Sequence, residues 1–348
     1  MKILFSGGGT IGSVSPLIAV YEEIKKQHPG AEFLWLATSD GPEDKLIGSY
    51  QIPLKKIFAG KFRRYFSWQN FFDPILIIFG FFQALAIILK FKPQAVISAG
   101  GFVAVPVTWA AWLCRRPVLI LQQDIRPGLA NKLMARFASI IAVAFPKSLA
   151  DFPGPKTVLT GNPVRPEILT GSREAGYKFF NFDPQLPTVL ILGGGTGALS
   201  INRLVAGSIA ELVKFCQVIH LTGGKPIQNF SDPRYRNFDF LTDQLKNAYA
   251  AADLVVARAG MGTLTELAAL AKPALIIPLP QSHQQENATE FFRHNAIAVV
   301  NEAGLEPKDF AQAIKQLLFD QAELANLSRN IGKIMPAKAA EKIAKMIL

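Results

Sequence analysis

Two glycine-rich segments are the first places in this 348-residue chain where chemistry is expected. Residues 6–16 read SGGGTIGSVSP after a short apolar run, and GGGTGAL at 193–199 follows a second such run. Both segments are expected to place bare backbone N–H groups at the start of a helix, where the helix dipole favours an anion. The spacing Gly7-x-Gly9-x-x-Gly12 also fits a dinucleotide fingerprint. Each segment is therefore a candidate phosphate site.

A third candidate segment, RAGMGTLTELA, begins at Arg258, where another apolar run ends. Gly260 and Gly262 predict a tight turn, and a helix is expected to start near Thr263. The spacing Thr263-x-x-Glu266 matches a capping box, in which the glutamate satisfies a backbone N–H and has a structural role. The functional alternative is that Glu266 accepts hydrogen bonds from the diol of a ribose.

A fourth segment, QSHQQENA at 281–288, follows the next apolar run and concentrates amide side chains there. Gln and Asn offer both donors and acceptors, which suits the hydroxyls of a sugar. His283 is a base, a capping residue or an oriented donor in this context. For a lone histidine, the structural role is the expected one.

The elements that must position these segments are short apolar runs that alternate with helical patterns. The expected buried strands are KILFSG, EFLWLAT, AVISAG, PVLILQ and IIAVAF in the first half, then TVLILGG, QVIHLTG, LVVARAG and ALIIPLP. Such alternation predicts parallel sheets with helices on both faces, and two such series predict two similar doubly wound domains. Ligands of such sheets bind outside the carboxyl ends of the strands, so a cleft between the domains is the expected site.

The domain boundary is expected near TGNPVRPEIL, residues 160–169, because its two prolines suit a hinge. A length of 348 residues, half of them hydrophobic, also favours two domains over one core. Residues 337–348 predict one amphipathic helix that can cross back to the first domain.

The bulk composition restricts the class of protein and its partners. Cys114 and Cys216 lie in apolar surroundings and form no disulfide framework or metal set, which fits a reducing cytosol. The N-terminus, MKILFSGGG, predicts a strand rather than a signal peptide. A net charge of +11 indicates an anionic partner. No helix-turn-helix spacing, zinc finger or aromatic RNA-binding strand is evident, so no nucleic acid is expected.

One segment, residues 60–93, combines a strongly apolar helix with basic neighbours. Asp73 is the expected N-cap, Pro74 the first helical position, and Gln83 the only polar side chain between Ile75 and Leu89. That stretch is about 25 Å long, short of the roughly 30 Å hydrocarbon core, so a membrane span is not expected. Two readings remain, a core helix or a patch that dips into a membrane. The patch would consist of Ile75, Ile78, Phe79 and Phe82, with Lys61, Arg63 and Arg64 as a basic rim and Lys90 and Lys92 at the other end.

Several segments together resemble the MurG family of bacterial peptidoglycan glycosyltransferases, in the family's order and over essentially the whole chain. They are GGTIGSVSP, GKFRRYFS, SAGGFVAVP, QQDIRPGLANK, GNPVRPEIL, GGGTGALSIN, RAGMGTLTELA and HQQENA. The resemblance implies the GT-B fold, two Rossmann-like domains whose parallel sheets face a central cleft. It implies an acceptor and membrane-side domain at 1–162, joined by a C-terminal helix at about 335–348, and a UDP-sugar domain at 163–334.

The resemblance also implies an activity. It is the inverting transfer of N-acetylglucosamine (GlcNAc) from UDP-GlcNAc to undecaprenyl-pyrophosphoryl-N-acetylmuramyl (MurNAc)-pentapeptide. Family members act as peripheral enzymes on the cytoplasmic face of the plasma (inner) membrane, an anionic surface. The sequence contains no Asp-x-Asp motif, and no metal or other cofactor is expected.

The resemblance implies site residues at matching positions. Thr10, Ile11 and Gly12 match contacts to the donor or the acceptor pyrophosphate, Asp124 matches a contact to the transferred sugar, and Thr242 matches a backbone contact to uracil. The donor is expected near Arg165, Gly195, Thr196 and the run Met261, Gly262, Thr263, Leu264, Thr265 and Glu266, with Gln284 at the GlcNAc. For Glu266, the match favours binding of the ribose diol over the structural capping role.

Departures from the family's pattern fall on the expected general base. Ser13 stands where the first loop usually ends in His, Gln122 stands where an acidic residue is often seen, and Gly195 replaces a serine. Neutral Ser and Gln side chains are not general bases near pH 7. Asp124 is the carboxylate that remains in the motif, so the hypothesis is that Asp124 acts as the base, with Ser13 in a doubtful role.

Three alternatives stay open from the sequence. The first is a related UDP-sugar transferase with another lipid acceptor, and the second is a donor-binding protein with impaired catalysis. The third is an NAD-dependent oxidoreductase, which the strand ends disfavour. NAD binding needs an acidic residue at the end of the second strand, but Asp40 comes two residues too late and HLTGG has no acid.

Overall fold

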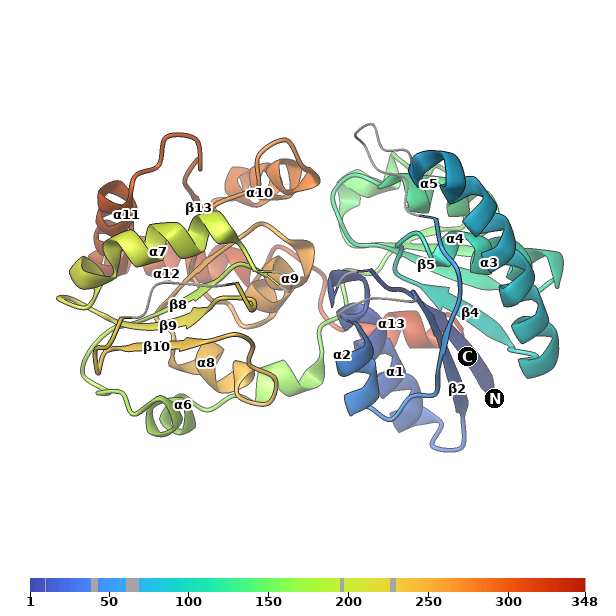
Figure 1. The fold of residues 1–348 in the computed structure, drawn as a ribbon, viewed down its shortest axis with the longest axis horizontal. Coiled ribbons are helices and arrows are strands. Elements are labelled where there is room, and N and C mark those ends of the chain that lie inside the picture. Colours follow the sequence, from blue (N-terminus) through green and yellow to red (C-terminus); the bar gives the residue numbers. More distant parts are fainter. Residues whose placement is uncertain (10, 39–42, 61–68, 195–196, 226–229, 348) are drawn as a thin grey trace. The chain divides into compact units, whose positions relative to one another are not determined.

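The chain folds into two compact units, each built around its own parallel sheet (Figure 1). The computed structural model describes residues 1–9, 11–38, 43–60, 69–194, 197–225 and 230–347; the side chains of residues 11, 43, 45 and 69–72 are also outside the description. Unit 1 is Met1–Arg165 with Pro336–Leu348, and unit 2 is Pro166–Met335. The chain passes from unit 1 to unit 2 after Arg165 and returns after Met335, whereas the sequence placed these boundaries after residues 162 and 334.

Unit 1 contains a seven-stranded parallel sheet in the order β3-β2-β1-β4-β5-β6-β7. Its strands are β1 (Lys2–Ser6), β2 (Glu32–Ala37), β3 (Leu54–Lys56), β4 (Ala95–Ser98), β5 (Val118–Gln122), β6 (Ile140–Val143) and β7 (Thr157–Leu159). Its helices are η1 (Ile11–Ser13), α1 (Ser15–Gln27), α2 (Glu43–Ser49), α3 (Gln69–Phe91), α4 (Ala104–Leu113), α5 (Leu129–Ala135), η2 (Pro146–Leu149) and α13 (Ala339–Lys345).

Unit 2 repeats this plan with a six-stranded parallel sheet in the order β10-β9-β8-β11-β12-β13. Its strands are β8 (Thr188–Leu192), β9 (Gln217–Leu221), β10 (Tyr235–Phe238), β11 (Leu254–Ala257), β12 (Ala274–Ile276) and β13 (Ala298–Val299). Its helices are η3 (Pro166–Thr170), α6 (Arg173–Phe180), α7 (Leu199–Leu212), α8 (Leu245–Ala251), α9 (Met261–Ala269), α10 (His283–Arg293), α11 (Pro307–Phe319) and α12 (Gln321–Ile331).

The nine expected strands are present, and the doubly wound α/β fold is confirmed. Their apolar runs are continuous because helices cover both faces of a parallel sheet. In unit 1 one core lies between the sheet and helices α1 and α13, and a second lies between the sheet and helices α3, α4 and α5. Unit 2 has a core between its sheet and helices α7, α11 and α12.

Helix α3 is longer than the sequence predicted, and its start differs. It begins at Gln69, so Asp73 is not its N-cap and Pro74 lies inside it. At 23 residues it is about 34 Å long. In the described part of the chain, residues Asp73–Phe91 form one helix that is long and apolar enough to cross a membrane, judged by length and composition alone. The length argument against a membrane span therefore fails.

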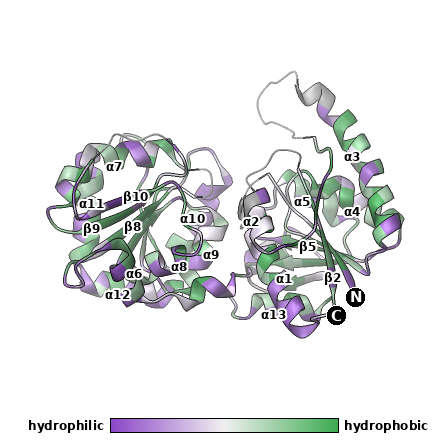
Figure 2. Ribbon diagram, turned by 60° about the horizontal axis from the view of Figure 1, so that its bottom comes forward, coloured by the Kyte–Doolittle hydropathy of each residue, from purple (hydrophilic) through white to green (hydrophobic). Residues whose placement is uncertain are grey.

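Helix α3 has both a face buried in the core and an exposed apolar face. It therefore has features of both interpretations of the sequence, a core helix and an exposed apolar patch. Ala84 and Ile88 are buried in the core beneath α4. The expected patch residues are exposed: Ile75 by 48%, Ile78 by 56%, Phe79 by 57% and Phe82 by 60%. Figure 2 shows apolar residues along most of α3. The expected rim residues Lys61, Arg63 and Arg64 lie outside the described residues.

Helix α13 packs against α1 and returns the end of the chain to unit 1. Ile343 and Ala344 are fully buried in the same core as Trp35. The chain crosses close to Gly161, whose φ is +82° and where a Cβ atom would meet the Pro336 carbonyl oxygen at 2.6 Å. Glycine is therefore the residue that this crossing accommodates.

Candidate functional site

In unit 2 the strand order reverses between β8 and β11, and the second glycine segment follows β8 directly. A crevice at the carboxyl ends of strands on either side of such a reversal is where open α/β sheets bind ligands. Gly194 and Gly197 have φ values of +80° and +69°, which glycine adopts without strain. Ala198 is the N-cap of α7 and provides no side-chain cap. The expected residues Gly195 and Thr196 lie outside the described residues.

Helix α9 follows β11 across the reversal, and here the predicted capping box is wrong. Its N-cap is Gly260, without a side-chain cap, so the helix begins at Met261 rather than near Thr263. The Thr265 hydroxyl donates to the Met261 carbonyl at 2.7 Å instead. Met261, Leu264 and Thr265 are buried, whereas Gly262 and Thr263 are half-buried. The first turn of α9 therefore presents backbone N–H groups, not a reciprocal cap.

Glu266 projects from α9 and is held by a neighbouring helix. The Tyr249 hydroxyl, on α8, donates to Glu266 Oε2 at 2.8 Å. The side chain is half-buried. This hydrogen bond fixes the orientation of the carboxylate.

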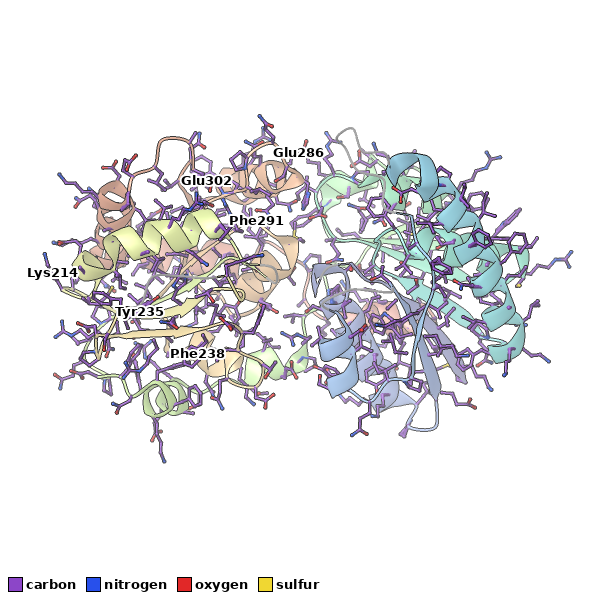
Figure 3. All side chains as sticks on the ribbon, viewed as in Figure 1. Lys214, Tyr235, Phe238, Glu286, Phe291 and Glu302 are labelled. Carbon is purple, nitrogen blue, oxygen red and sulfur yellow. The ribbon has the colours of Figure 1, made fainter. Side chains whose placement is uncertain are left out.

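Arg258, the first residue after β11, connects three segments at this edge: the start of α7, the loop after β12 and the loop after β13. Its guanidinium donates to both carboxylate oxygens of Glu302 at 2.9 and 2.8 Å, to Ser200 Oγ at 2.6 Å and to the Ile277 carbonyl at 3.0 Å. The Arg258 side chain is 7% exposed, and that of Glu302 is 17% exposed. Hydrogen bonds from Arg258 hold the pKa of Glu302 below its ordinary value. Figure 3 labels Glu302 on the segment after β13.

The amide-rich segment forms the start of α10. Ser282 is its N-cap and accepts from the Gln284 N–H at 3.2 Å, while Gln284 Oε1 accepts from the Leu279 N–H at 3.1 Å. Asn287 is fully buried and donates to the Ala259 carbonyl at 3.2 Å. His283 is exposed at the first helical position. The segment thus supports the loop after β11 through Asn287, a role that the sequence did not predict.

Two further expected donor residues belong to other segments of the chain. Thr242 is exposed in the turn before α8, and its carbonyl accepts from the Leu245 N–H at 3.3 Å. Arg165 is half-buried and is the last residue of unit 1.

In unit 1 the first glycine segment follows β1, next to the reversal between β1 and β4. Trp35 Nε1 donates to the Gly7 carbonyl at 2.9 Å, and Ser13 Oγ donates to the Gly8 carbonyl at 3.2 Å. Ser13 is 8% exposed and closes the loop on itself. Gly12 is exposed within η1; Thr10 and the side chain of Ile11 lie outside the description. Ser13 is therefore a loop-closing residue in this structure.

Gln122 is the last residue of strand β5, and Asp124 follows two residues later at the same edge of unit 1. Gln122 is 2% exposed, donates to the Asp124 carbonyl at 2.7 Å and accepts from Asn131 Nδ2 at 2.7 Å. Both ends of its amide are thus engaged in shaping the turn. The Asp124 side chain is half-buried in that turn.

A buried polar network beneath the carboxyl edge of the unit 2 sheet was not predicted from the sequence. His220 on β9 contacts the Tyr235 hydroxyl through Nδ1 at 2.9 Å and Asn202 Oδ1 through Nε2 at 3.1 Å. Asn202 Nδ2 in turn donates to the Thr222 carbonyl at 3.0 Å. Burial lowers the pKa of His220 to about 4 and raises the pKa of Tyr235 to about 12. The available signal was one histidine inside the apolar run QVIHLTG.

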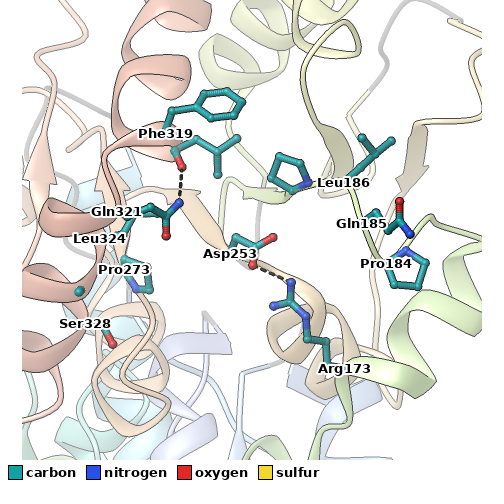
Figure 4. A pocket seen from close by; sticks show the side chains of 13 residues that line it. Arg173, Pro184, Gln185, Leu186, Asp253, Pro273, Phe319, Gln321, Leu324 and Ser328 are labelled. Carbon is teal, nitrogen blue, oxygen red and sulfur yellow. Dashed lines mark hydrogen bonds and ion pairs between the residues drawn. The ribbon is translucent and has the colours of Figure 1, made fainter.

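A cavity of about 520 Å³ lies elsewhere in unit 2, lined by residues that precede strands β8, β11 and β12 (Figure 4). Pro187, Asp253 and Pro273 come directly before these strands, so the cavity is at the amino edge of the sheet, opposite the glycine segment. Arg173 and Asp253 form an ion pair there at 2.7 Å. Within the ranges that the structure describes, no cluster of three His, Cys, Asp or Glu side chains is arranged to hold a metal ion.

Comparison with known proteins identifies the family. Residues 3–143 match the glycosyltransferase family 28 N-terminal domain, and residues 188–346 match the corresponding C-terminal domain. A UDP-N-acetylglucosamine–N-acetylmuramyl-(pentapeptide) pyrophosphoryl-undecaprenol N-acetylglucosamine transferase of Lachnospira eligens is 38% identical, over 96% of this chain and 97% of the relative. One of the same name from Clostridium kluyveri is 37% identical over 91% of each chain.

A solved structure leads to the same family as the sequence relatives do. The crystal structure of Acinetobacter baumannii MurG matches with a TM-score of 0.73 and 25% identity, covering 99% of this chain and 98% of that one. The same family is indicated by the fold, by both halves of the sequence and by the full-length relatives. The chain therefore belongs to the MurG family of glycosyltransferase family 28.

Proposed function

We propose that this chain transfers GlcNAc from UDP-GlcNAc to undecaprenyl-pyrophosphoryl-MurNAc-pentapeptide, with inversion at the anomeric carbon. The observation that carries the proposal is the full-length similarity to relatives named for this reaction. The two glycine segments support it, because each follows the first strand of a sheet at the point where the strand order reverses. The acceptor hydroxyl attacks the anomeric carbon, the bond to the UDP oxygen breaks, and UDP leaves.

The donor binds at the carboxyl edge of unit 2 in this proposal. The uncapped first turns of α7 and α9 provide backbone N–H groups for the diphosphate, and these donors stabilise the charge that develops on the leaving group. Gly195, Thr196 and Arg165 serve the same diphosphate, so no metal ion is required. Glu266, oriented by Tyr249, binds the ribose diol.

The remaining contacts follow the family's positions. Thr242 contacts uracil through its backbone, and Gln284 contacts GlcNAc. Residues 10–12 in unit 1 bind the acceptor pyrophosphate.

Asp124 is the proposed general base. Ser13 and Gln122, which stand at the two positions where the family usually has titratable groups, both form hydrogen bonds that shape their loops. Asp124 combines an ionisable carboxylate with a half-buried position at the acceptor edge of unit 1. It accepts the proton of the acceptor hydroxyl as the new glycosidic bond forms.

The protein works at the cytoplasmic face of the plasma membrane in this proposal, where its lipid-linked acceptor is held. The exposed face of α3 provides apolar contact with lipid, and Lys90 and Lys92 at its end attract anionic headgroups. Helix α4 packs along α3 and ends in Trp112 and Leu113, each 55% exposed. These two residues are further exposed apolar side chains outside the patch that the sequence predicted.

Transfer of radiolabelled GlcNAc from UDP-GlcNAc to a synthetic lipid-linked MurNAc-pentapeptide tests the function, and Asp124→Asn tests the base. We expect Asp124→Asn to lower kcat by about 10²- to 10⁴-fold while UDP affinity stays within about threefold. Asp151→Asn is the matched control. It makes the same change of charge in the same unit, at an aspartate that pairs with Arg126.

Each contrary outcome has a distinct meaning. UDP binding without any transfer supports a donor-binding protein with impaired catalysis. Transfer only to a different lipid supports a related transferase. Nearly unchanged turnover in Asp124→Asn assigns Asp124 to sugar positioning alone.

A further inference from the structure

The buried network around His220 has one consistent arrangement of hydrogens. Only the amide NH2 of Asn202 can donate to the Thr222 carbonyl, so Asn202 Oδ1 must face His220. Nε2 of His220 then carries the proton, and the bare Nδ1 accepts from the Tyr235 hydroxyl. The hydrogen bonds run in one direction from β10 through β9 and α7 to the Thr222 carbonyl. All four residues are at most 6% exposed, so no member exchanges its partner for bulk water.

The Thr222 carbonyl, where this network ends, lies against the second glycine segment. A Cβ atom on Gly197 would meet that oxygen at 2.5 Å, so the two backbones are in close contact. Gly223 follows in the same turn with a positive φ, and its N–H donates to the Asp239 carbonyl at 2.9 Å. The Thr222 hydroxyl donates to Asp239 Oδ1 at 3.0 Å. The turn after β9 is thereby joined to the loops after β8 and β10.

We propose that His220 and Asn202 are positioning residues that hold the Thr222 carbonyl and, through it, Gly197 before α7 in the position that donor binding requires. This inference rests on the proposed function, since it assigns a role at the same donor edge. Neither side chain touches the donor; they act through the backbone at Thr222 and Gly197.

The alternative is that the network only stabilises the core of unit 2. Loss of the imidazole leaves the buried Asn202 Oδ1 without its donor, which costs free energy. The Asn202 amide is then expected to reorient, and the turn at Thr222 to shift, until both groups are satisfied. A shift at Thr222 moves its contact with Gly197, whereas loss of ordinary packing beneath the same sheet lowers stability without that shift. The two roles therefore differ in their effect on local backbone order and on UDP affinity.

Three substitutions separate these roles. His220→Leu removes both hydrogen bonds of the imidazole. His220→Gln restores a donor toward Asn202, because a glutamine Nε2 reaches close to the position of the histidine Nε2. Val218→Ala is the matched control, because Val218 is fully buried two residues earlier on β9, on the same face, and has no side-chain hydrogen-bonding group.

UDP affinity is measured by calorimetry, and hydrogen exchange is followed at the amides of Gly197 and Gly223. In the wild type these amides donate to the carbonyls of Gly194 and Asp239. We expect His220→Leu to weaken UDP binding by about 10- to 100-fold and to accelerate exchange at both amides. His220→Gln is expected to stay within about threefold of the wild type. Val218→Ala is expected to lower the melting temperature without a selective change at either amide.

The proposal is overturned if His220→Leu changes UDP affinity and exchange no more than Val218→Ala does at a comparable loss of stability. It is also overturned if His220→Gln is as impaired as His220→Leu. A wild-type protein that binds no UDP would contradict the proposed function instead. The exchange at Gly197 and Gly223 would still decide whether the network positions the backbone.

Discussion

At the scale of single residues, the ion pair between Arg258 and Glu302 makes the stability of unit 2 depend on pH. Both side chains are largely buried, and the bidentate geometry satisfies both carboxylate oxygens. Arg258 also donates to Ser200 at the start of α7 and to the Ile277 carbonyl after β12. Loss of one partner would leave an uncompensated buried charge beneath the proposed donor edge.

Glu302→Gln is expected to lower the free energy of unfolding of unit 2 by about 3 kcal/mol at neutral pH. Hydrogen bonds from Arg258 lower the folded-state pKa of Glu302 from its ordinary 4.5. Its stabilising contribution is therefore complete above pH 4.5 and is lost as the pH falls through the lowered folded-state value. The difference in stability between wild type and Glu302→Gln should narrow below pH 4.5. Urea unfolding followed by circular dichroism between pH 7 and pH 3 measures it.

An exposed carboxylate provides the control for this prediction. Glu211→Gln, in α7, removes a solvent-exposed pair with Lys214 and should leave stability nearly unchanged. A difference between Glu302→Gln and wild type that stays constant down to pH 3 would contradict the role given to the ion pair.

Residue roles were only partly predictable from the sequence. Motif order located the edges where Asp124, Glu266 and Gln284 lie, but it did not identify their neighbours. Thr263 matched a capping box by spacing, yet the helix begins two residues earlier at Met261. The engagement of Ser13 with the Gly8 carbonyl depends on the three-dimensional path of its own loop. Spacing along the chain does not encode such contacts.

At the scale of elements, predictability follows burial. Interior strands such as β1, β5 and β8 are buried on both faces and give uninterrupted apolar runs. The strands that the sequence did not predict are β3, β7, β10 and β13, each at an edge of its sheet. β3 reads LKK and β10 reads YRNF, because an edge strand has one side without a partner strand and tolerates polar residues.

Helix α3 supports a prediction about membrane binding. Substitution of Ile78, Phe79 and Phe82 by Ser should weaken binding to vesicles that contain phosphatidylglycerol by about tenfold or more for each side chain. Each apolar side chain that lipid buries fully contributes about 1.5–3 kcal/mol. Sedimentation with vesicles measures the partition, and high salt should weaken the wild-type protein further by screening the basic residues.

The control for α3 is Phe292→Ser, because Phe292 in unit 2 is 56% exposed, as much as the substituted residues. It should leave vesicle binding unchanged. Equal binding of the triple variant and the wild type would show that another surface contacts lipid.

At the scale of the whole molecule, the chain does not divide into two continuous halves. Unit 1 is completed by Pro336–Leu348, which return after the whole of unit 2. Ile343 is fully buried in the core that contains Trp35, although about 300 residues separate them in sequence. The repeated strand pattern predicted two domains, but an amphipathic helix at the end of a chain does not specify by itself which core it joins.

This arrangement predicts that one substitution near the C-terminus destabilises the N-terminal unit selectively. All four tryptophans precede residue 113, so tryptophan fluorescence reports the unfolding of unit 1 alone. Ile343→Ala should shift that transition by about 2–5 kcal/mol, because it opens a cavity beside α1. Ile314→Ala removes the same atoms from the core of unit 2 and should leave the fluorescence transition in place while shifting the circular dichroism signal. If both substitutions moved the tryptophan signal equally, the two units would unfold as one cooperative body, and the C-terminal helix would not be a specific support of unit 1.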